Sequence, residues 1–334
     1  MRRLSVLDQS PISQGMTGGD ALRNSVDLAR FVDQLGFGRY WVAEHHGTAM
    51  LAGTSPEILI GPIASATRRL RVGSGGVMLP HYSPLKVAET FSLLSALHPG
   101  RIDLAVGRAA GTDPMTAFAL QRDRRTAAPD DFPEQLAELL AYVRDGFPTS
   151  HRFARLAALA GAPDQPEPWL LGSSPQSGLW AAETGLPYAF ADFINPAGAQ
   201  VAQRYRETFV PSTTRRTPYV VVAAWALCAE SDEEAQRLAS SSRMAFAHFL
   251  SGTPILVPPV DTALEFLARH PESLTALARR RRAIVGTPAS VSHQLEALAD
   301  EYGADELMVV TITYDHAARR RSYELLAREY AAAS

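Results

Sequence analysis

The sequence is nearly without cysteine and has no long apolar stretch. Cys228 is the only cysteine in 334 residues, which excludes an internal disulfide framework and a metal site built from cysteine thiolates. No run of about 18 apolar residues occurs, so we expect no membrane-spanning helix. The opening residues, MRRLSVLDQS, lack the apolar segment of a secretory signal, and we therefore expect a cytoplasmic protein.

The chain also lacks an excess of positive charge. Its 32 lysine and arginine residues against 35 aspartate and glutamate residues give a net charge of −3, which disfavours a nucleic-acid-binding protein. Lys86 is the only lysine, a bias that fits a GC-rich coding genome better than a physical requirement. Apolar residues make up 46% of the chain, enough for a full core. Length alone suggests two domains, although α/β barrels of this size often form one.

Short apolar segments alternate with helical patterns along the chain. We predict strands near residues 4, 40, 72, 102, 169, 188, 219 and 307, each followed by a helical pattern. Eight such alternations indicate an α/β fold of the (β/α)8 TIM barrel type, here a single domain over residues 1–334. A doubly wound sheet is the alternative. It usually carries a glycine fingerprint after its first strand, whereas residues 4–8 lead into Gln9-Ser10-Pro11.

One segment interrupts the alternation, between the seventh and eighth predicted strands. Residues 251–282 contain four prolines and end in a run of arginines at 279–282. A solvated insertion is the simplest interpretation of the arginines. Because long insertions in such folds often gate active sites, we also predict that this segment is a mobile lid.

The ends of the predicted strands carry the candidate site, because active residues of barrels collect at the carboxyl ends of the strands. Gly75-Gly76 ends one strand, and adjacent glycines there either form a bulge or admit a flat ligand close to the backbone. Arg108 follows the next strand and adds a fixed charge. The strand ends together give Asp8, Glu44, His45, His46, Gly75, Gly76, Val77, Arg108, Ser173, Ser174 and Ser177.

Two of these groups suggest a phosphate site. Ser174 precedes Pro175 and is a predicted helix N-cap, so backbone N–H groups and the helix dipole behind it can bind an anion. Ser177 adds a hydroxyl in the first turn, and Arg108 can bind phosphate in a bidentate manner. An ordinary capped helix beside a solvated arginine is the alternative. Together with Gly75-Gly76, we predict a phosphorylated, planar cofactor.

His45 and His46 suggest acid–base chemistry, since a histidine can titrate near neutral pH or donate a hydrogen bond to a developing charge. A metal site is disfavoured, because adjacent histidines on an extended segment point in different directions and no third ligand has diagnostic spacing. A serine triad is disfavoured because no G-x-S-x-G motif is present.

Seven segments carry a resemblance to a known family: LDQSP at 7–11, AEHH at 43–46, VGSGGVMLP at 72–80, PGRIDLA at 99–105, GRAAGTDP at 107–114, LGSS at 171–174 and DELMVVTITYD at 305–315. In this order they resemble the bacterial luciferase-like flavin monooxygenase superfamily, and most closely the branch with actinobacterial antibiotic-tailoring oxygenases. The family fold is a (β/α)8 barrel, in agreement with the strand count.

The resemblance implies reduced FMN, supplied by a separate NAD(P)H:flavin reductase, which reacts with O2 through a C4a-peroxyflavin to oxidise a small organic substrate such as an aromatic polyketide. By motif match, Arg108 and residues 174–177 hold the phosphate, and His45 is the catalytic histidine. Gly75-Gly76 lies against the flavin ring, where relatives often carry a non-prolyl cis peptide. Luciferase has a reactive cysteine where this chain has Gly107, so the role of that thiol does not carry over.

The resemblance leaves two alternatives open, an F420-dependent hydride-transfer enzyme and a non-catalytic flavin-binding protein. It also implies a homodimer that pairs through the predicted helices at 56–67 and 85–97.

Overall fold

The computed structural model describes residues 1–109, 111–121, 123–126, 130–159, 161, 164–280 and 283–332. Within these ranges nine parallel strands form one sheet, and the β6–β7 pairing closes all but β8 into a barrel. The barrel strands are β1 (Arg3–Asp8), β2 (Arg39–Val42), β3 (Arg71–Met78), β4 (Ile102–Gly107), β5 (Glu167–Gly172), β6 (Tyr188–Ala191), β7 (Val220–Cys228) and β9 (Glu306–Val310). The predicted (β/α)8 barrel is confirmed.

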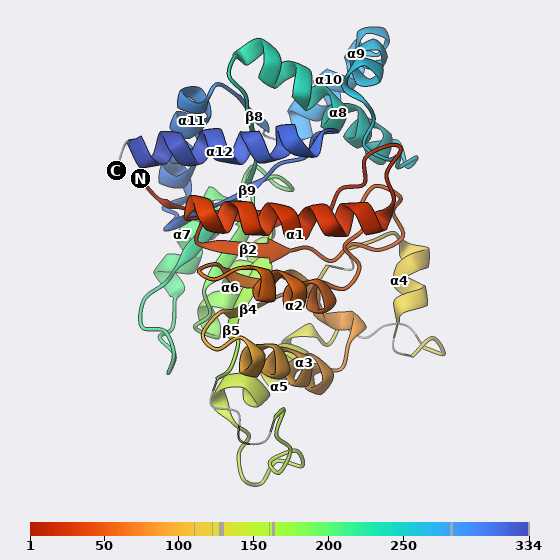
Figure 1. Cartoon of the computed structure of the whole chain (residues 1–334). Coiled ribbons are helices and arrows are strands. Elements are labelled where there is room, and N and C mark those ends of the chain that lie inside the picture. Colours follow the sequence, from red (N-terminus) through yellow and green to blue (C-terminus); the bar gives the residue numbers. More distant parts are fainter. Residues whose placement is uncertain are drawn as a thin grey trace.

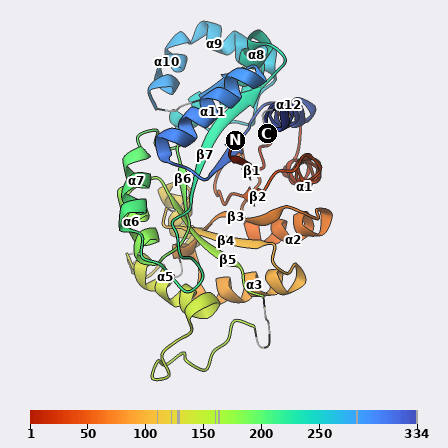
Figure 2. The same cartoon turned by 90° about the vertical axis from the view of Figure 1, so that its left-hand side faces the viewer.

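Helices surround the strands (Figures 1 and 2). The surrounding helices are α1 (Gly18–Leu35), α2 (Pro56–Ala66), α3 (Pro84–Leu97), α5 (Phe132–Leu140), α6 (Pro175–Glu183), α7 (Ala199–Thr208), α11 (Pro288–Tyr302) and α12 (His316–Ala332). A short 3-10 turn, η1 (Leu79–His81), precedes α3, and a π-helical turn, η2 (Ala141–Asp145), extends α5. No helix of the described chain is both long and apolar enough to cross a membrane.

The core has two layers, one inside the barrel and one between the strands and the helices. In β7 the side chains alternate: Val221 and Trp225 belong to the inner cluster, and Val220 and Val222 to the outer one. All of β7 is buried, as expected for a parallel strand covered on both faces. Both faces of a strand are therefore apolar, and its sequence does not reveal which side chains point into the barrel.

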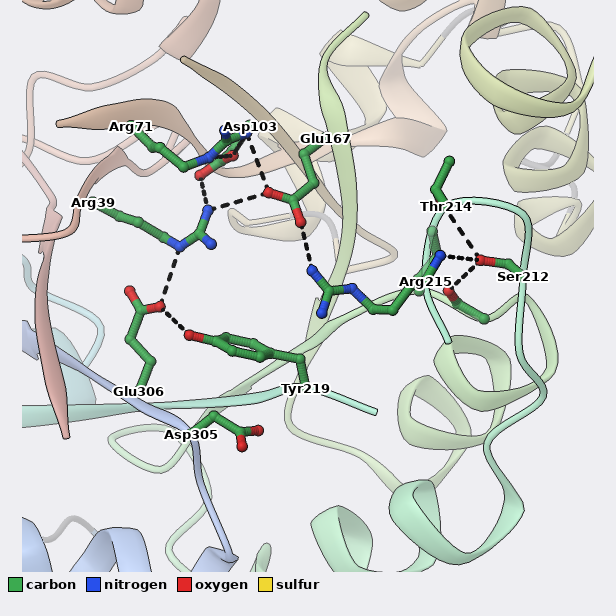
Figure 3. Close-up of polar contacts among 12 residues, drawn as sticks. Arg39, Arg71, Asp103, Glu167, Ser212, Thr214, Arg215, Tyr219, Asp305 and Glu306 are labelled. Atoms are coloured by element: carbon green, nitrogen blue, oxygen red, sulfur yellow. Dashed lines mark hydrogen bonds and ion pairs between the residues drawn. The ribbon is translucent and has the colours of Figure 1, made fainter. Parts of the chain in front are cut away.

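A network of ion pairs closes the amino-terminal end of the barrel (Figure 3). Arg39, at the start of β2, lies 2.6 Å from Asp103, 3.2 Å from Glu306 and 3.5 Å from Glu167. Further contacts to these carboxylates come from Arg71, Arg215, Tyr219, Trp41 and Ser5. In barrels the amino-terminal end supports stability, whereas catalytic residues lie at the opposite end. The active site is therefore expected at the carboxyl ends of the strands.

The segment between β7 and β9 differs most from the sequence-based prediction. It contains α8 (Asp232–Leu250), α9 (Val260–Arg269), α10 (Pro271–Arg280) and the unpredicted strand β8 (Ala283–Gly286). β8 pairs with the last four residues of β7, beyond the end of β6. The short apolar segment of β8 lies between the arginine run at 279–282 and Thr287-Pro288, which starts the next helix, and the sequence analysis did not separate it from that helix. Arg281 and Arg282, in the predicted insertion, lie outside the described residues, and the mobility of the insertion stays a prediction.

Two smaller differences concern α3 and α4. The helical spacing of Val87, Phe91, Leu94 and Leu97 predicts one buried face, and the first three are buried. The Leu97 side chain is 73% exposed, because it is the last residue of α3 and no following turn covers it. α4 (Pro114–Leu120) was not predicted, since it contains no buried residue and therefore no periodic apolar face. In Figure 1 it stands apart from the ring of helices, beside the barrel.

Candidate active site

Glu44, directly after β2, is the centre of a buried hydrogen-bond network. Its side chain has no exposed surface. Its carboxylate accepts hydrogen bonds from the Met78 backbone N–H at 2.9 Å, the Tyr82 hydroxyl at 2.9 Å and His46 Nε2 at 2.8 Å. An ionised carboxylate only accepts hydrogen bonds, so His46 donates from Nε2 and, when neutral, keeps Nδ1 as an acceptor. Glu44 thus fixes the orientation of His46 and ties the end of β2 to the end of β3.

His45 has different surroundings from His46. Its ring is half-buried, lies with Nε2 at 3.4 Å from the amide nitrogen of Gln9, and is hydrogen bonded to the backbone of Gly111. Burial lowers the pKa of His45, and the neighbouring His46 lowers it further, against the raising effect of the Gly111 contact. His45 is therefore neutral at pH 7, able to donate or accept one proton.

The loop after β4 packs onto the two histidines. The Thr112 hydroxyl donates to the His46 carbonyl at 2.8 Å. Gly47 allows this close approach, since a Cβ there would lie 2.5 Å from Thr116 Oγ1 and 2.9 Å from Asp113 Oδ2. Asp113 also caps α4 through the Thr116 backbone N–H at 3.1 Å. The segment that follows Arg108 and the segment that carries His45 and His46 are thus in direct contact.

Arg108 lies beside α6. Its guanidinium carbon is 5.4 Å from the ring centre of Trp180, a residue of that helix, and its side chain is 48% exposed. The nearest carboxylate oxygen shown for it, on Asp130, is 3.9 Å away, and the Asp130 side chain is 81% exposed. An ion pair so exposed to solvent contributes little to stability, so the Arg108 guanidinium is available to an anion.

The start of α6 is capped as predicted. Ser174 adopts an extended conformation, and its hydroxyl accepts from the Ser177 backbone N–H at 3.4 Å. The Ser177 hydroxyl, however, is buried and is shared with the Ser174 carbonyl and the Tyr188 hydroxyl, both at 2.8 Å. The Ser173 carbonyl accepts from the Asn195 side chain at 2.9 Å. The start of α6 therefore offers backbone N–H groups and the Ser174 hydroxyl to an anion, whereas the Ser177 hydroxyl is already hydrogen bonded within the fold.

The peptide bond between Gly75 and Gly76 is cis, as predicted. A Cβ on Gly75 would lie 2.5 Å from Leu7 Cδ1, and a Cβ on Gly76 would lie 2.5 Å from Leu171 Cδ2 and 2.6 Å from the Ala105 carbonyl oxygen. Packing inside the barrel therefore already requires glycine at both positions. Gly75 remains partly exposed while Gly76 is buried, so Gly75 is the member of the pair that a ligand can reach.

The side chains of Asp8 and Val77, near the ends of β1 and β3, point away from the barrel interior. The Asp8 carboxylate, fully buried, accepts from Arg319 at 2.7 Å, from the Ser10 backbone N–H at 2.7 Å and from the Tyr40 hydroxyl. Burial raises its pKa, but Arg319 and the hydrogen bonds lower it more. Val77 packs in the outer core. Both side chains face the helices, so direct side-chain contact with a cofactor is not supported.

Sequence reasoning missed the roles of Glu44 and Tyr82. The signal for Glu44 was a single acidic residue between a buried strand and two histidines, whereas nothing in the sequence indicated its partner Tyr82, 38 positions further on. Across the described ranges, no group of three or more histidine, cysteine, aspartate or glutamate side chains could hold a metal ion.

Comparison with known proteins identifies close relatives over the whole chain. The family described as luciferase-like monooxygenase matches residues 2–306. The uncharacterized protein YwcH of Bacillus subtilis is 44% identical, over 99% of this chain and 100% of that protein. N-acetyl-S-alkylcysteine monooxygenase of Bacillus subtilis is 37% identical, over 98% of this chain and 97% of that protein. The crystal structure of apo-MsnO8 superposes with a TM-score of 0.91 at 40% identity and covers 99% of each chain.

More distant structures share the fold alone. The oxygenating constituent of 3,6-diketocamphane monooxygenase from Pseudomonas putida, solved with FMN, has a TM-score of 0.71 at 20% identity and covers 98% of this chain and 97% of its own. An F420-dependent secondary alcohol dehydrogenase has a TM-score of 0.64 at 14% identity and covers 97% and 98%. From the family match and the close relatives, the chain belongs to the luciferase-like monooxygenase family, whose members are oxidoreductases.

Proposed function

We propose that this protein is a monooxygenase that uses reduced FMN and O2 to oxidise a small organic substrate. The observation that carries the proposal is the position of Arg108 beside α6, a helix that Ser174 caps. An exposed guanidinium and a helix amino terminus are both good phosphate ligands, and the phosphate of FMN fits them.

Bound reduced FMN would supply the electrons that activate O2. The chain's own residues have three tasks around it. Arg108 and the first turn of α6 bind the phosphate, and the partly exposed Gly75 lets the flavin ring approach the strand. His45, neutral at pH 7, donates a hydrogen bond or moves a proton at the reacting oxygen. His46, held by Glu44, supports the segment that carries His45.

Two classes of compound are candidates for the substrate. The motifs resemble actinobacterial antibiotic-tailoring oxygenases, which favours a secondary metabolite such as an aromatic polyketide. The relative named N-acetyl-S-alkylcysteine monooxygenase favours a thioether instead, and its identity of 37% over nearly the whole chain makes this the candidate to test first.

F420 is the alternative cofactor, because an F420-dependent alcohol dehydrogenase shares the fold. A phosphate site does not distinguish F420 from FMN, since both carry phosphate. A non-catalytic flavin-binding protein is the third possibility, against which the ordered Glu44–His46 pair beside His45 argues.

The decisive experiment compares the two cofactors directly. We expect anaerobically reduced FMN to bind, and the loaded protein to transfer one atom of isotopically labelled O2 to N-acetyl-S-methylcysteine or to an aromatic polyketide. An alcohol-dependent reduction of F420, without oxygen transfer from reduced FMN, would contradict the proposal.

The proposal includes two partners. A separate NAD(P)H:flavin reductase would supply the reduced FMN. A second copy of the chain would cover the apolar side chains that α2 and α3 expose, namely Ile58 at 72%, Leu93 at 49% and Leu97 at 73% exposure. Other large apolar residues of these two helices, Leu59, Ile60, Ile63, Phe91 and Leu94, are buried within the chain and do not contribute to this surface.

A further inference from the structure

Arg243, on α8, lines a small cavity at the carboxyl end of the barrel. The cavity measures about 30 Å³ and lies between α8, β8 and the ends of β7 and β9. Its lining is apolar except for two side chains: Trp225, Ala226, Leu227, Ala239, Ser242, Arg243, Ala283, Val285 and Ile312. The Ser242 hydroxyl is bonded to the Ala239 carbonyl at 2.9 Å, which leaves Arg243 as the polar group available to a ligand.

Arg243 is half-buried without a counterion. Its guanidinium donates one hydrogen bond, to the neutral side chain of Gln236, although it has five N–H donors. No carboxylate in the described part of the chain pairs with it. Burial lowers the pKa of Arg243, and no acidic neighbour offsets this effect. An arginine keeps its charge in proteins, so the desolvated cation favours an anion that enters from outside.

The cavity adjoins the barrel interior where a substrate would lie. Trp225 and Ile312 line the cavity and also belong to the inner cluster. In the closed barrel β7 stands four strands from β3, directly across the mouth from Gly75. Arg108 follows β4, so Arg243 is separate from the predicted phosphate site. A molecule between the flavin and β7 would point one end toward Arg243.

We propose that Arg243 binds the carboxylate of the substrate, and that the substrate is therefore a small organic acid. This inference rests on the proposed function only in taking a flavin as the other ligand of the site. The apolar walls accept the body of the molecule, and about 30 Å³ holds a group of carboxylate size. A guanidinium binds a carboxylate through two parallel hydrogen bonds, which a neutral amide cannot reproduce.

The test compares N-acetyl-S-methylcysteine with its primary amide, which has the same shape without the charge. Binding is measured by calorimetry on the whole protein, without reductant or turnover. We expect the protein to bind the acid about 10- to 100-fold more tightly than the amide. Arg243→Met should abolish the preference, and Arg243→Lys should restore part of it. The matched control is Arg237→Met, an exposed arginine of α8 paired with Glu234 at 2.7 Å, which should keep the preference.

Three results would overturn the proposal. In the first, the natural protein binds the acid and the amide equally, or binds neither detectably. In the second, the preference for the acid survives Arg243→Met. In the third, Arg243→Met loses affinity for FMN. The last would place the cofactor phosphate at Arg243. Failure of FMN-dependent oxygen transfer would instead contradict the proposed function and leave the binding result unaffected, because the calorimetric assay involves no oxidation.

Discussion

Replacing Arg39 with methionine tests the ion network at the amino-terminal end of the barrel (Figure 3). Arg39 is 5% exposed and lies between two carboxylates, Asp103 and Glu306, that are fully buried. Without it, Asp103 keeps Arg71 and the indole N–H of Trp41. Among the residues that the structure describes, Glu306 then keeps two neutral hydroxyl donors, those of Tyr219 and Ser5. The variant therefore contains a buried carboxylate without a counterion.

Breaking a buried pair in this way costs about 3–5 kcal/mol, because the remaining charge stays desolvated. We expect Arg39→Met to lower the free energy of unfolding by that amount at pH 7, measured by urea denaturation.

A second substitution separates the charge effect from the loss of packing. Glu306→Gln in the Arg39→Met background removes the unpaired charge. The Ser5 and Tyr219 hydroxyls donate to separate oxygens of Glu306, so the glutamine carbonyl can accept from one of them while its NH2 group donates to the other, and stability at pH 7 should be regained. A double-mutant cycle then gives the coupling energy of the pair. The reasoning would be refuted if Arg39→Met stayed within about 1 kcal/mol of the natural protein, or if Glu306→Gln in that background did not restore stability.

Four further predictions concern the site and the surface. Arg108→Ala should weaken FMN binding about 10- to 100-fold and leave the melting temperature unchanged, and an unaltered affinity would remove Arg108 from the phosphate site. His45→Ala should lower turnover about tenfold or more while flavin still binds, and His46→Ala should lower it less; equal turnover of His45→Ala and the natural protein would contradict the assignment. The His45 ring should titrate below pH 6.5 by NMR, so the stability it contributes is present above pH 6.5 and is lost as the pH falls below that value. The chain should sediment as a dimer at micromolar concentration and Leu97→Glu as a monomer, and a monomeric natural protein would contradict the dimer.

The barrel was predictable because its strands are apolar runs separated by helical periods. The same apolar pattern does not show which side chains point into the barrel. Leu7 points into the barrel and Val6 outward, so Asp8 points outward to Arg319, but both faces of a parallel strand are apolar and the sequence does not distinguish them. Of the strand-end residues proposed to bind the cofactor, Asp8 and Val77 therefore direct their side chains toward the helices.

Contacts between distant segments were the part that the sequence could not supply. Arg108 and Ser174 could be selected as phosphate ligands from their types and positions, but the contact of Arg108 with Trp180 joins residues 72 positions apart in the chain. The cavity at Arg243 depends on β8, a strand that the sequence analysis did not predict. In the sequence Arg243 therefore resembles Arg237, the exposed arginine of the same helix, and only the fold shows that it lies against an apolar wall.

The two arginines proposed to bind ligands differ from those of the amino-terminal ion network in their partners, and the difference separates binding from stability. At the amino-terminal end, Arg39, Arg71 and Arg215 each lie within 2.7 Å of a carboxylate oxygen. At the carboxyl end, Arg108 is 3.9 Å from the exposed Asp130, and Arg243 has no carboxylate partner in the described chain. An internal carboxylate would compete with a ligand for the guanidinium. Its absence at Arg108 and Arg243 leaves these cations available to anions, so substitutions there should change affinity where those at the other end change stability.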